Sequence, residues 1–216
     1  MNPFEALLRS GLAELQLRLT DGQIVQLLDY LALLQKWNQV YNLTAVREPA
    51  AMLTHHLLDS LSVVRPLLRQ VGDKAVRLLD VGSGGGLPGV VIAICCPQIQ
   101  VDCVDTVAKK AAFVRQVAAS QGLTNLHSLH ARVEKLSGPY DVISSRAFAS
   151  LPDFVSWSVG ALGTNGVWMA MKGKLPANEI DSLPSTVSVF HVEQLTVPGL
   201  DAERCLIWLR PAAGVT

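Results

Sequence analysis

The chain has 216 residues, of which 50% are hydrophobic and 17% are charged, and its 18 basic and 18 acidic side chains give a formal net charge of zero. This composition excludes an intrinsically disordered protein, which would combine low hydrophobicity with high net charge. The balanced charge weighs against a protein that coats nucleic acid through an overall basic field, but it is compatible with an enzyme that has a local basic patch.

The sequence has neither a membrane span nor the features of a secretory signal. No apolar run approaches the roughly 20 residues that a membrane helix needs, and Glu5 and Arg9 interrupt the first residues. The four cysteines form no C-x-x-C pair, and Cys95 and Cys96 lie in an apolar stretch. We therefore expect reduced cysteines, a cytoplasmic location and no membrane association.

The first part of the chain, residues 1–72, has helical patterns and is expected to form a helical N-terminal cap. Thr20 followed by Gln23 is a capping box, and it begins a predicted helix over 20–37 whose leucines fall on one face. A second amphipathic helix is expected over 50–64, ending near Pro66.

From residue 73 to residue 216 strands alternate with helices, which predicts a parallel sheet with helices on both faces. Two later β-rich runs, 187–197 and 204–210, are separated only by a loop, so we expect them to pair as an antiparallel hairpin. The prediction is a doubly wound, mostly parallel, seven-stranded α/β sheet. Its other strands are expected at 76–81, 99–104, 125–130, 140–145 and 166–171, and its helices at 90–96, 107–121 and 151–162.

A glycine-rich turn joins the first strand to the next helix, in the sequence Asp80-Val-Gly-Ser-Gly-Gly-Gly-Leu-Pro-Gly89. Glycines allow a sharp turn and a close approach of ligand to backbone, and a helix N-terminus offers free N–H groups. Because ligands of α/β sheets bind at the carboxyl ends of strands, the turn predicts a nucleotide-type site. Part of it matches the dinucleotide fingerprint, but the spacing Asp80-x-Gly82-x-Gly84-x-Gly86 looks like the first motif of S-adenosylmethionine-dependent methyltransferases.

Two charged residues follow later strands. Asp105 ends the second strand, where a carboxylate can accept both hydroxyls of a ribose, and we favour this role over that of an N-cap for the helix at 107–121. Arg146 ends the fourth strand, where its guanidinium can bind a carboxylate or phosphate, or read O6 of guanine. The alternative for Arg146 is a plain ion pair with a buried acid.

Six ordered stretches within about 20–210 resemble one family, the guanine-N7 methyltransferases of ribosomal small-subunit RNA, also called the glucose-inhibited division protein B family. The resemblance implies a class I, Rossmann-like methyltransferase that uses S-adenosylmethionine to methylate N7 of a guanine in the decoding-region stem-loop of 16S ribosomal RNA. The stretches are Leu34–Thr44, His56–Leu61, Asp80–Gly89, Lys109–Phe113, Ser145–Ala149 and Met171–Gly173.

The chemistry of further residues suggests contacts to RNA. Phe148 is a candidate for stacking on a flipped base, with core packing as the alternative. The candidates for a phosphate-binding rim are Lys109, Lys110, Arg115, Lys172 and Lys174. The resemblance implies cofactor contacts at Gly82, Leu87, Val133, Glu134 and Arg146, and Gly84 and Asp105 complete the expected cofactor site. The expected partner is 16S ribosomal RNA or a small-subunit particle, and the expected state is a monomer.

Guanine N7 carries a lone pair and no hydrogen, so its methylation needs no general base and depends on in-line placement. We expect no metal, because His55, His56 and Asp59 lack a convincing further ligand; His56 and Asp59 are expected to hydrogen-bond the cap onto the sheet. Two other functions stay open at this point: a nicotinamide-dependent oxidoreductase built on the same turn, and a non-enzymatic RNA-binding or assembly module.

Overall fold

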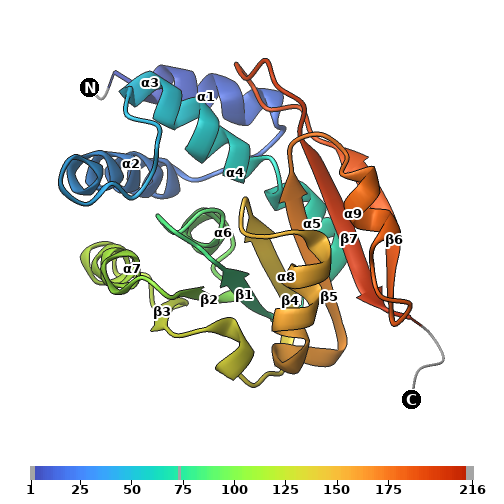
Figure 1. Ribbon diagram of the computed structural model, residues 1–216. Helices are drawn as coiled ribbons and strands as arrows, with labels where there is room; N and C mark the ends of the chain where they lie inside the picture. Colours follow the sequence, from blue (N-terminus) through green and yellow to red (C-terminus); the bar gives the residue numbers. More distant parts are fainter. Residues whose placement is uncertain (1–2, 73, 213–216) are drawn as a thin grey trace.

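The computed structural model describes residues 3–72 and 74–212, which form one seven-stranded sheet in the order β3-β2-β1-β4-β5-β7-β6 (Figure 1). The first five strands run parallel, and β7 pairs antiparallel with both β5 and β6. This confirms the predicted doubly wound sheet with a C-terminal hairpin. The strands are β1 (Arg77–Val81), β2 (Gln100–Asp105), β3 (Leu126–His130), β4 (Tyr140–Arg146), β5 (Leu162–Lys172), β6 (Val187–Gln194) and β7 (Cys205–Pro211).

The helices of the described ranges are α1 (Glu5–Glu14), α2 (Asp21–Tyr41), α3 (Pro49–Met52), α4 (Asp59–Leu61), α5 (Val64–Val71), α6 (Gly89–Cys95), α7 (Ala108–Gln121), α8 (Leu151–Ser158) and α9 (Ala177–Asp181). The capping box of Thr20 and Gln23 begins α2 as predicted. None of the helices in these ranges is both long and apolar enough to cross a membrane.

The predicted helix over 50–64 is wrong in its form. A π-helical turn, Leu53–Leu58, separates α3 from α4, and the chain does not leave the helical conformation near Pro66 but enters α5 two residues before it. Proline is tolerated there because the N–H groups in the first turn of a helix have no intrahelical acceptor.

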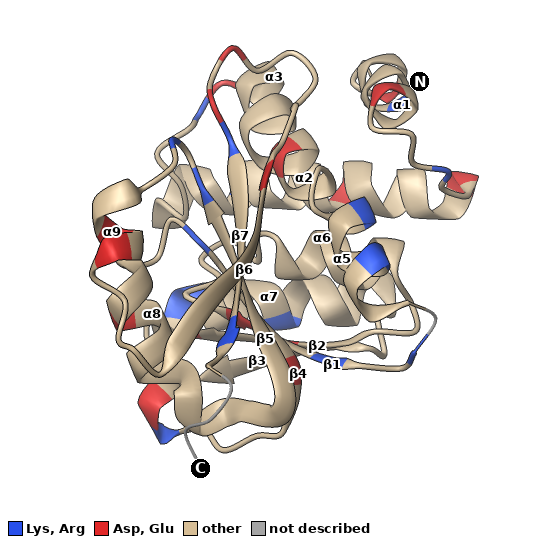
Figure 2. Ribbon diagram, turned by 90° about the vertical axis from the view of Figure 1, so that its right-hand side faces the viewer, with Lys and Arg blue, Asp and Glu red and all other residues tan. Residues whose placement is uncertain are grey.

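Alternate residues of the strands pack into two cores on opposite faces of the sheet. Leu78 belongs to the core that is covered by α2, α5, α6 and α7, whereas Leu79 belongs to the core under α8. Figure 2 shows the hairpin from its own side, with basic and acidic residues interspersed over this part of the molecule. Both faces of the parallel strands are therefore closed, and the ends of the strands are left for a site.

Helix α2 lies over α6 and α7 and reaches the glycine-rich turn. The buried Tyr30 hydroxyl donates to the carbonyl oxygen of Gly85 at 2.6 Å, and burial raises the pKa of this phenol well above its ordinary value. Trp37 packs edge-on against Phe113 of α7, with ring centroids 5.4 Å apart. The helical cap thus supports the turn from outside the sheet.

Removal of the Tyr30 hydroxyl is expected to lower the free energy of unfolding by about 1–2 kcal/mol, because Tyr30→Phe leaves a buried carbonyl without its donor. Chemical denaturation measures the loss. Tyr41→Phe, at the half-exposed end of the same helix, is the matched control and should leave stability unchanged. Equal effects of the two substitutions would mean that the bond to Gly85 adds nothing.

Candidate functional site

The turn after β1 depends on its glycines. Gly82, Gly84 and Gly86 have φ values of +66°, +57° and +84°, in the left-handed region where other residues are strained. The N–H of Gly82 donates to the carbonyl oxygen of Val104 at 2.9 Å, which holds the turn against β2. A Cβ atom on Gly82 would overlap the ring of Phe148. The alternate glycines of the motif are therefore required by the backbone conformation, and Gly82 also by its neighbour.

Asp80 lies beneath this turn and is fully buried. One carboxylate oxygen accepts the N–H of Gly89 at 2.9 Å, and the other accepts the hydroxyl of Ser144 at 3.0 Å. Burial raises the pKa of Asp80 to about 7, although both hydrogen bonds favour the charged form. Asp80 thus joins β1 to the start of α6 and to β4, and it does not face the solvent.

The raised pKa of Asp80 predicts pH-dependent stability. The unfolded chain loses this proton near pH 3.8, whereas the folded chain keeps it up to about pH 7. The folded state therefore binds more protons in this window, and the free energy of unfolding falls as the pH rises through it, by roughly 2–4 kcal/mol.

Asp80→Asn isolates this effect, because an amide can accept from Gly89 while it donates to Ser144. Denaturation of both proteins between pH 4 and pH 8 measures the difference in their free energies of unfolding. We expect the wild type to lose stability relative to the variant as the pH rises, and then to level off. Parallel curves for the two proteins would contradict the raised pKa.

A cavity of about 410 Å³ opens beside the turn, at the carboxyl ends of the first three parallel strands. One wall is apolar and comes from Val104, Val133, Phe148 and Trp157, and the polar groups include carboxylates and a lysine. Such a mixture suits a nucleoside, since an aromatic base needs an apolar wall and a ribose needs acceptors. The residues at its polar side are Asp105, Lys110, Arg132 and Glu134.

Asp105 is 7% exposed and connects two parts of this cavity. One oxygen accepts the N–H of Gly84 at 3.0 Å and the other accepts the N–H of Val107 at 2.8 Å. The Lys110 ammonium lies 3.8 Å from the first oxygen. The carboxylate thus ties the glycine turn to the start of α7, and each oxygen keeps a second lone pair for a ligand. Asp105 is not the N-cap of α7, because that position is Val107 and no side chain caps the helix. Its place in the wall of the cavity is compatible with the favoured ribose role.

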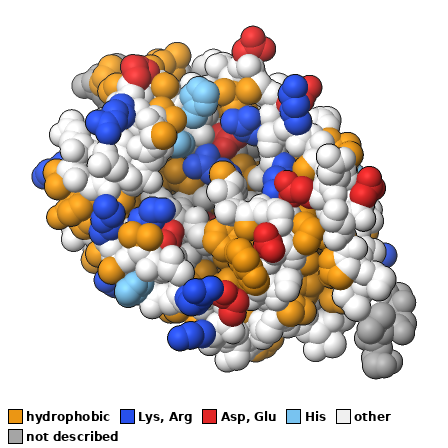
Figure 3. All heavy atoms as spheres, in the orientation of Figure 1, with side chains coloured by type: hydrophobic (Ala, Val, Ile, Leu, Met, Phe, Trp, Pro, Cys, Tyr) orange, Lys and Arg blue, Asp and Glu red, His pale blue; other side chains and the backbone are white. Residues whose placement is uncertain are grey.

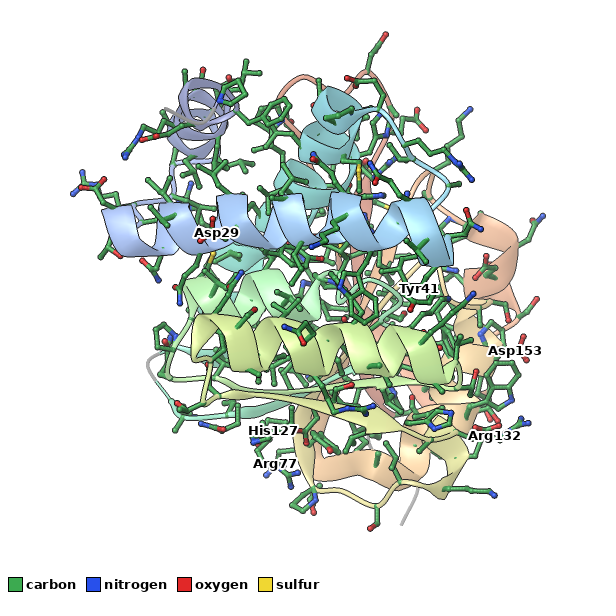
Figure 4. All side chains as sticks on the ribbon, turned by 90° about the vertical axis from the view of Figure 1, so that its left-hand side faces the viewer. Asp29, Tyr41, Arg77, His127, Arg132 and Asp153 are labelled. Carbon is green, nitrogen blue, oxygen red and sulfur yellow. The ribbon has the colours of Figure 1, made fainter. Side chains whose placement is uncertain are left out.

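The structure brings together most of the predicted cofactor residues. Glu134 lies in a 3₁₀ turn, Val133–Lys135, where Arg132 donates to it at 2.8 Å and lowers its pKa. Figure 4 shows Arg132 at the surface below the end of α2. Four predicted cofactor residues line the cavity, namely Gly82, Asp105, Val133 and Glu134, together with Lys110 and Phe148, which were predicted to contact RNA.

The other predicted residues lie elsewhere. Leu87 is 5% exposed and packs in the hydrophobic core, and the N–H of Gly84 points to Asp105. Lys109 is an exposed residue of α7. The Lys172 ammonium donates to Glu179 at 2.8 Å, so its charge is already paired.

Arg146 belongs to a second cluster beside the first cavity. Its Nη1 donates to Asp59 at 2.8 Å and to the carbonyl oxygen of His55 at 2.9 Å, as in the ion-pair alternative. The predicted link from Asp59 to the sheet is therefore confirmed. His56 also reaches the sheet, because its Nδ1 lies 3.5 Å from Nη2 of Arg146, while its Nε2 bonds Thr44 within the cap at 2.6 Å. Burial, followed by the charge of Arg146, lowers the pKa of His56 to about 4.

Two residues of the site were missing from the sequence prediction. Trp157 of α8 lines the first cavity, and Arg204, just before β7, donates from Nε to Asp59 at 2.8 Å. Arg204 and Asp59 are 145 residues apart, so no local pattern connects them. Within residues 3–72 and 74–212, no group of three or more His, Cys, Asp or Glu side chains is arranged to hold a metal ion.

Comparison with known proteins gives a consistent result along almost the whole chain. The model of the family described as rRNA small subunit methyltransferase G matches residues 23–207. A protein named Ribosomal RNA small subunit methyltransferase G from Acidovorax sp. (strain JS42) is 66% identical over 97% of this chain and 96% of its own. Its namesake from Albidiferax ferrireducens is 66% identical over 99% of this chain and all of its own.

Solved structures share the fold at low identity. TrmN from Thermus thermophilus has a TM-score of 0.55 and 19% identity, and the match covers 74% of this chain and 53% of that one. The [4+2]-cyclase SpnF reaches 0.57 with 15% identity, over 72% of this chain and 81% of its own. Because a cyclase and methyltransferases share this fold, the fold alone does not identify the reaction.

Proposed function

The chain belongs to the rRNA small subunit methyltransferase G family, and from that premise we propose that it transfers a methyl group from S-adenosylmethionine to N7 of a guanine in the decoding-region stem-loop of 16S ribosomal RNA. Members of this family are S-adenosylmethionine-dependent methyltransferases. The observation that carries the proposal for this chain is the cavity between the glycine turn, Asp105 and the 3₁₀ turn after β3.

The residues of this cavity fit S-adenosylmethionine part by part. Val133 and Val104 supply an apolar surface for adenine, and the carboxylates of Asp105 and Glu134 are acceptors for ribose hydroxyls. Gly82 lines the cavity, and the absence of a Cβ there lets the ring of Phe148 approach the turn closely. We propose these residues as the cofactor site, with Gly84 acting through its bond to Asp105 and Leu87 as a buried support of the turn.

The cofactor supplies a methyl group that is already activated by its positive sulfur. N7 of guanine has a free lone pair, so the protein need not remove a proton and has to hold the base in line with the methyl group. Arg146 is proposed as a positioning residue, fixed by Asp59 at the end of β4. Phe148, whose ring lies over Gly82 and edge-on to Trp157 at 5.9 Å, closes the boundary of the cavity.

Neither alternative function is favoured. An oxidoreductase with a second nucleotide-binding half would continue with parallel strands, whereas this sheet ends in the antiparallel pair β6 and β7. A non-enzymatic module could use the glycines and Asp105 to hold the turn, but it would not need the open cavity beside them. We therefore propose 16S ribosomal RNA, free or in a small-subunit particle, as the partner of a monomeric cytoplasmic enzyme, with Lys109, Lys110 and Lys172 near its path.

The test is methyl transfer to ribosomal RNA from a strain that lacks this activity. Protein and labelled S-adenosylmethionine are incubated with the RNA and with small subunits, and the modified base is mapped. We expect a single N7-methylguanine in the decoding region. Incorporation at another atom or in another RNA would overturn the proposed substrate, and tight NAD binding without binding of S-adenosylmethionine would restore the oxidoreductase.

A further inference from the structure

A second cavity of about 510 Å³ lies next to the first. It is bounded by the ends of β4 and β5, by the π-helical turn of the cap and by Arg204. Ala147, the residue after β4, lines both cavities and has a φ of +51°. In the sheet order β1 has β2 on one side and β4 on the other, so the two cavities lie on either side of the point where the strand order reverses. Ligands of α/β sheets bind at this point.

One buried carboxylate organises the second cavity. Asp59 is 2% exposed, and its two oxygens accept from Nη1 of Arg146 and Nε of Arg204, each at 2.8 Å. The same carboxylate therefore orients the guanidinium groups of Arg146 and Arg204. In Figure 3, basic, acidic and histidine side chains lie close together in the upper central part of the face.

The second cavity carries an excess of positive charge. Its lining residues include one acidic side chain, Asp59, and three basic ones, Arg146, Arg204 and Lys172. Lys172 is neutralised from outside the lining by Glu179. His56 adds no charge near neutral pH, because its pKa is lowered to about 4. The cavity therefore offers donors to an anionic or acceptor-rich ligand and few free acceptors.

Arg204 has donor capacity left for such a ligand. Its Nε is bound to Asp59 and its Nη1 to the carbonyl oxygen of Glu203 at 2.9 Å. Its Nη2 meets no acceptor in the part of the chain that the structure describes, and the side chain is 23% exposed. By contrast, Nη1 of Arg146 is shared between two acceptors.

We infer that the second cavity binds the acceptor guanosine nucleotide of the RNA, and that Arg204 is a substrate-binding residue there, held in position by Asp59. The inference rests on the proposed function. A guanosine nucleotide presents O6 and a phosphate as acceptors, which suit an arginine donor, while N7 must stay free for the methyl group. A base in this cavity would reach the first cavity past Ala147, the residue that the two share.

The test separates nucleotide binding from cofactor binding. Arg204→Met is expected to lower kcat/KM for the RNA about 100-fold at saturating S-adenosylmethionine, with the Kd for S-adenosylmethionine changed less than twofold. Arg204→Lys should fall between the two, since lysine keeps the charge without the fork. Arg69→Met is the control and should behave as wild type. Arg69 lies on α5, is paired with Glu193 of β6, and lines neither cavity.

Binding of free nucleotides gives a second readout. Titration with GMP, AMP and guanosine should show binding of GMP that Arg204→Met weakens at least tenfold. A preference for GMP over AMP supports a contact of Arg204 to O6. If GMP and AMP bind equally well and guanosine does not bind, the contact is to the phosphate. Unchanged kcat/KM and GMP binding in Arg204→Met would overturn the inference. If the wild type fails to methylate RNA while GMP still binds at Arg204, the proposed function fails and the site stands.

Discussion

Asp105→Ala is expected to weaken the binding of S-adenosylmethionine by at least 100-fold and to reduce methyl transfer accordingly. The substitution removes the acceptor of two backbone N–H groups, those of Gly84 and Val107. Hydrogen bonds to a charged group contribute about 1.5–3 kcal/mol each, and 1.4 kcal/mol corresponds to a factor of ten in affinity. The change therefore loosens the glycine turn and removes the proposed ribose acceptor together.

Two further variants distinguish these contributions. Asp105→Asn keeps one acceptor oxygen but replaces the other by an NH₂ group. This donor would face the backbone N–H of Gly84 or Val107, which is also a donor, so we expect an intermediate loss of affinity. Asp102→Ala, in the same strand, is the matched control because its carboxylate contacts Tyr140 at 2.6 Å and Arg77 at 3.3 Å. Figure 4 shows Arg77 and His127 in the lower left part of the view, on the opposite side from Arg132.

Isothermal titration gives the Kd for S-adenosylmethionine, and labelled methyl transfer gives the rate. Asp102→Ala should keep the wild-type Kd even where it lowers stability. If Asp105→Ala also keeps the wild-type Kd and rate, the carboxylate has neither role.

Much of the fold was predictable because its signals are local. Short apolar strands and amphipathic helices alternate after residue 73, and a tight connection leaves 187–197 and 204–210 no arrangement except a hairpin. The structure confirms both features, with β6 paired along β7. The cap was less predictable: the π-helical turn at Leu53–Leu58 and the passage of α5 through Pro66 depend on packing against the sheet, which no short window of sequence contains.

The site also contains residues that the sequence predicts and residues that only the folded structure reveals. Gly82 and Asp105 were predicted to be functional because a glycine motif and a strand end are visible in the sequence, and both line the first cavity. The sequence contains Asp59, Arg146 and Arg204 as well, but their ion-pair network joins segments 87 and 145 residues apart. An expected role for Arg146 was therefore possible, whereas Arg204 becomes visible only when β7 is folded beside β5.

The second cluster changes how Arg146 is understood. An arginine at a strand end was expected to contact the ligand of the first cavity directly. Its bonds to Asp59 and to the His55 carbonyl instead fix it between the cap and the sheet. The helical cap therefore takes part in building the proposed acceptor side.

Gly82→Ala is expected to lower the free energy of unfolding by about 2–5 kcal/mol and to abolish measurable binding of S-adenosylmethionine. Left-handed backbone costs a residue with a Cβ about 1–2 kcal/mol, and overpacking adds about 1–3 kcal/mol. Both apply here, because φ is +66° and the new methyl group would overlap the ring of Phe148.

Gly84→Ala is the control that separates the two terms. Its φ is +57°, but a Cβ there meets nothing nearer than the carbonyl oxygen of Gly82 at 3.9 Å, so only the backbone cost of about 1–2 kcal/mol should appear. A double-mutant cycle with Phe148→Ala completes the test by chemical denaturation. Once the ring is removed, Gly82→Ala should cost no more than Gly84→Ala. If its cost is the same with and without the ring, Phe148 does not close over the turn, and the boundary that we assign to the first cavity is wrong.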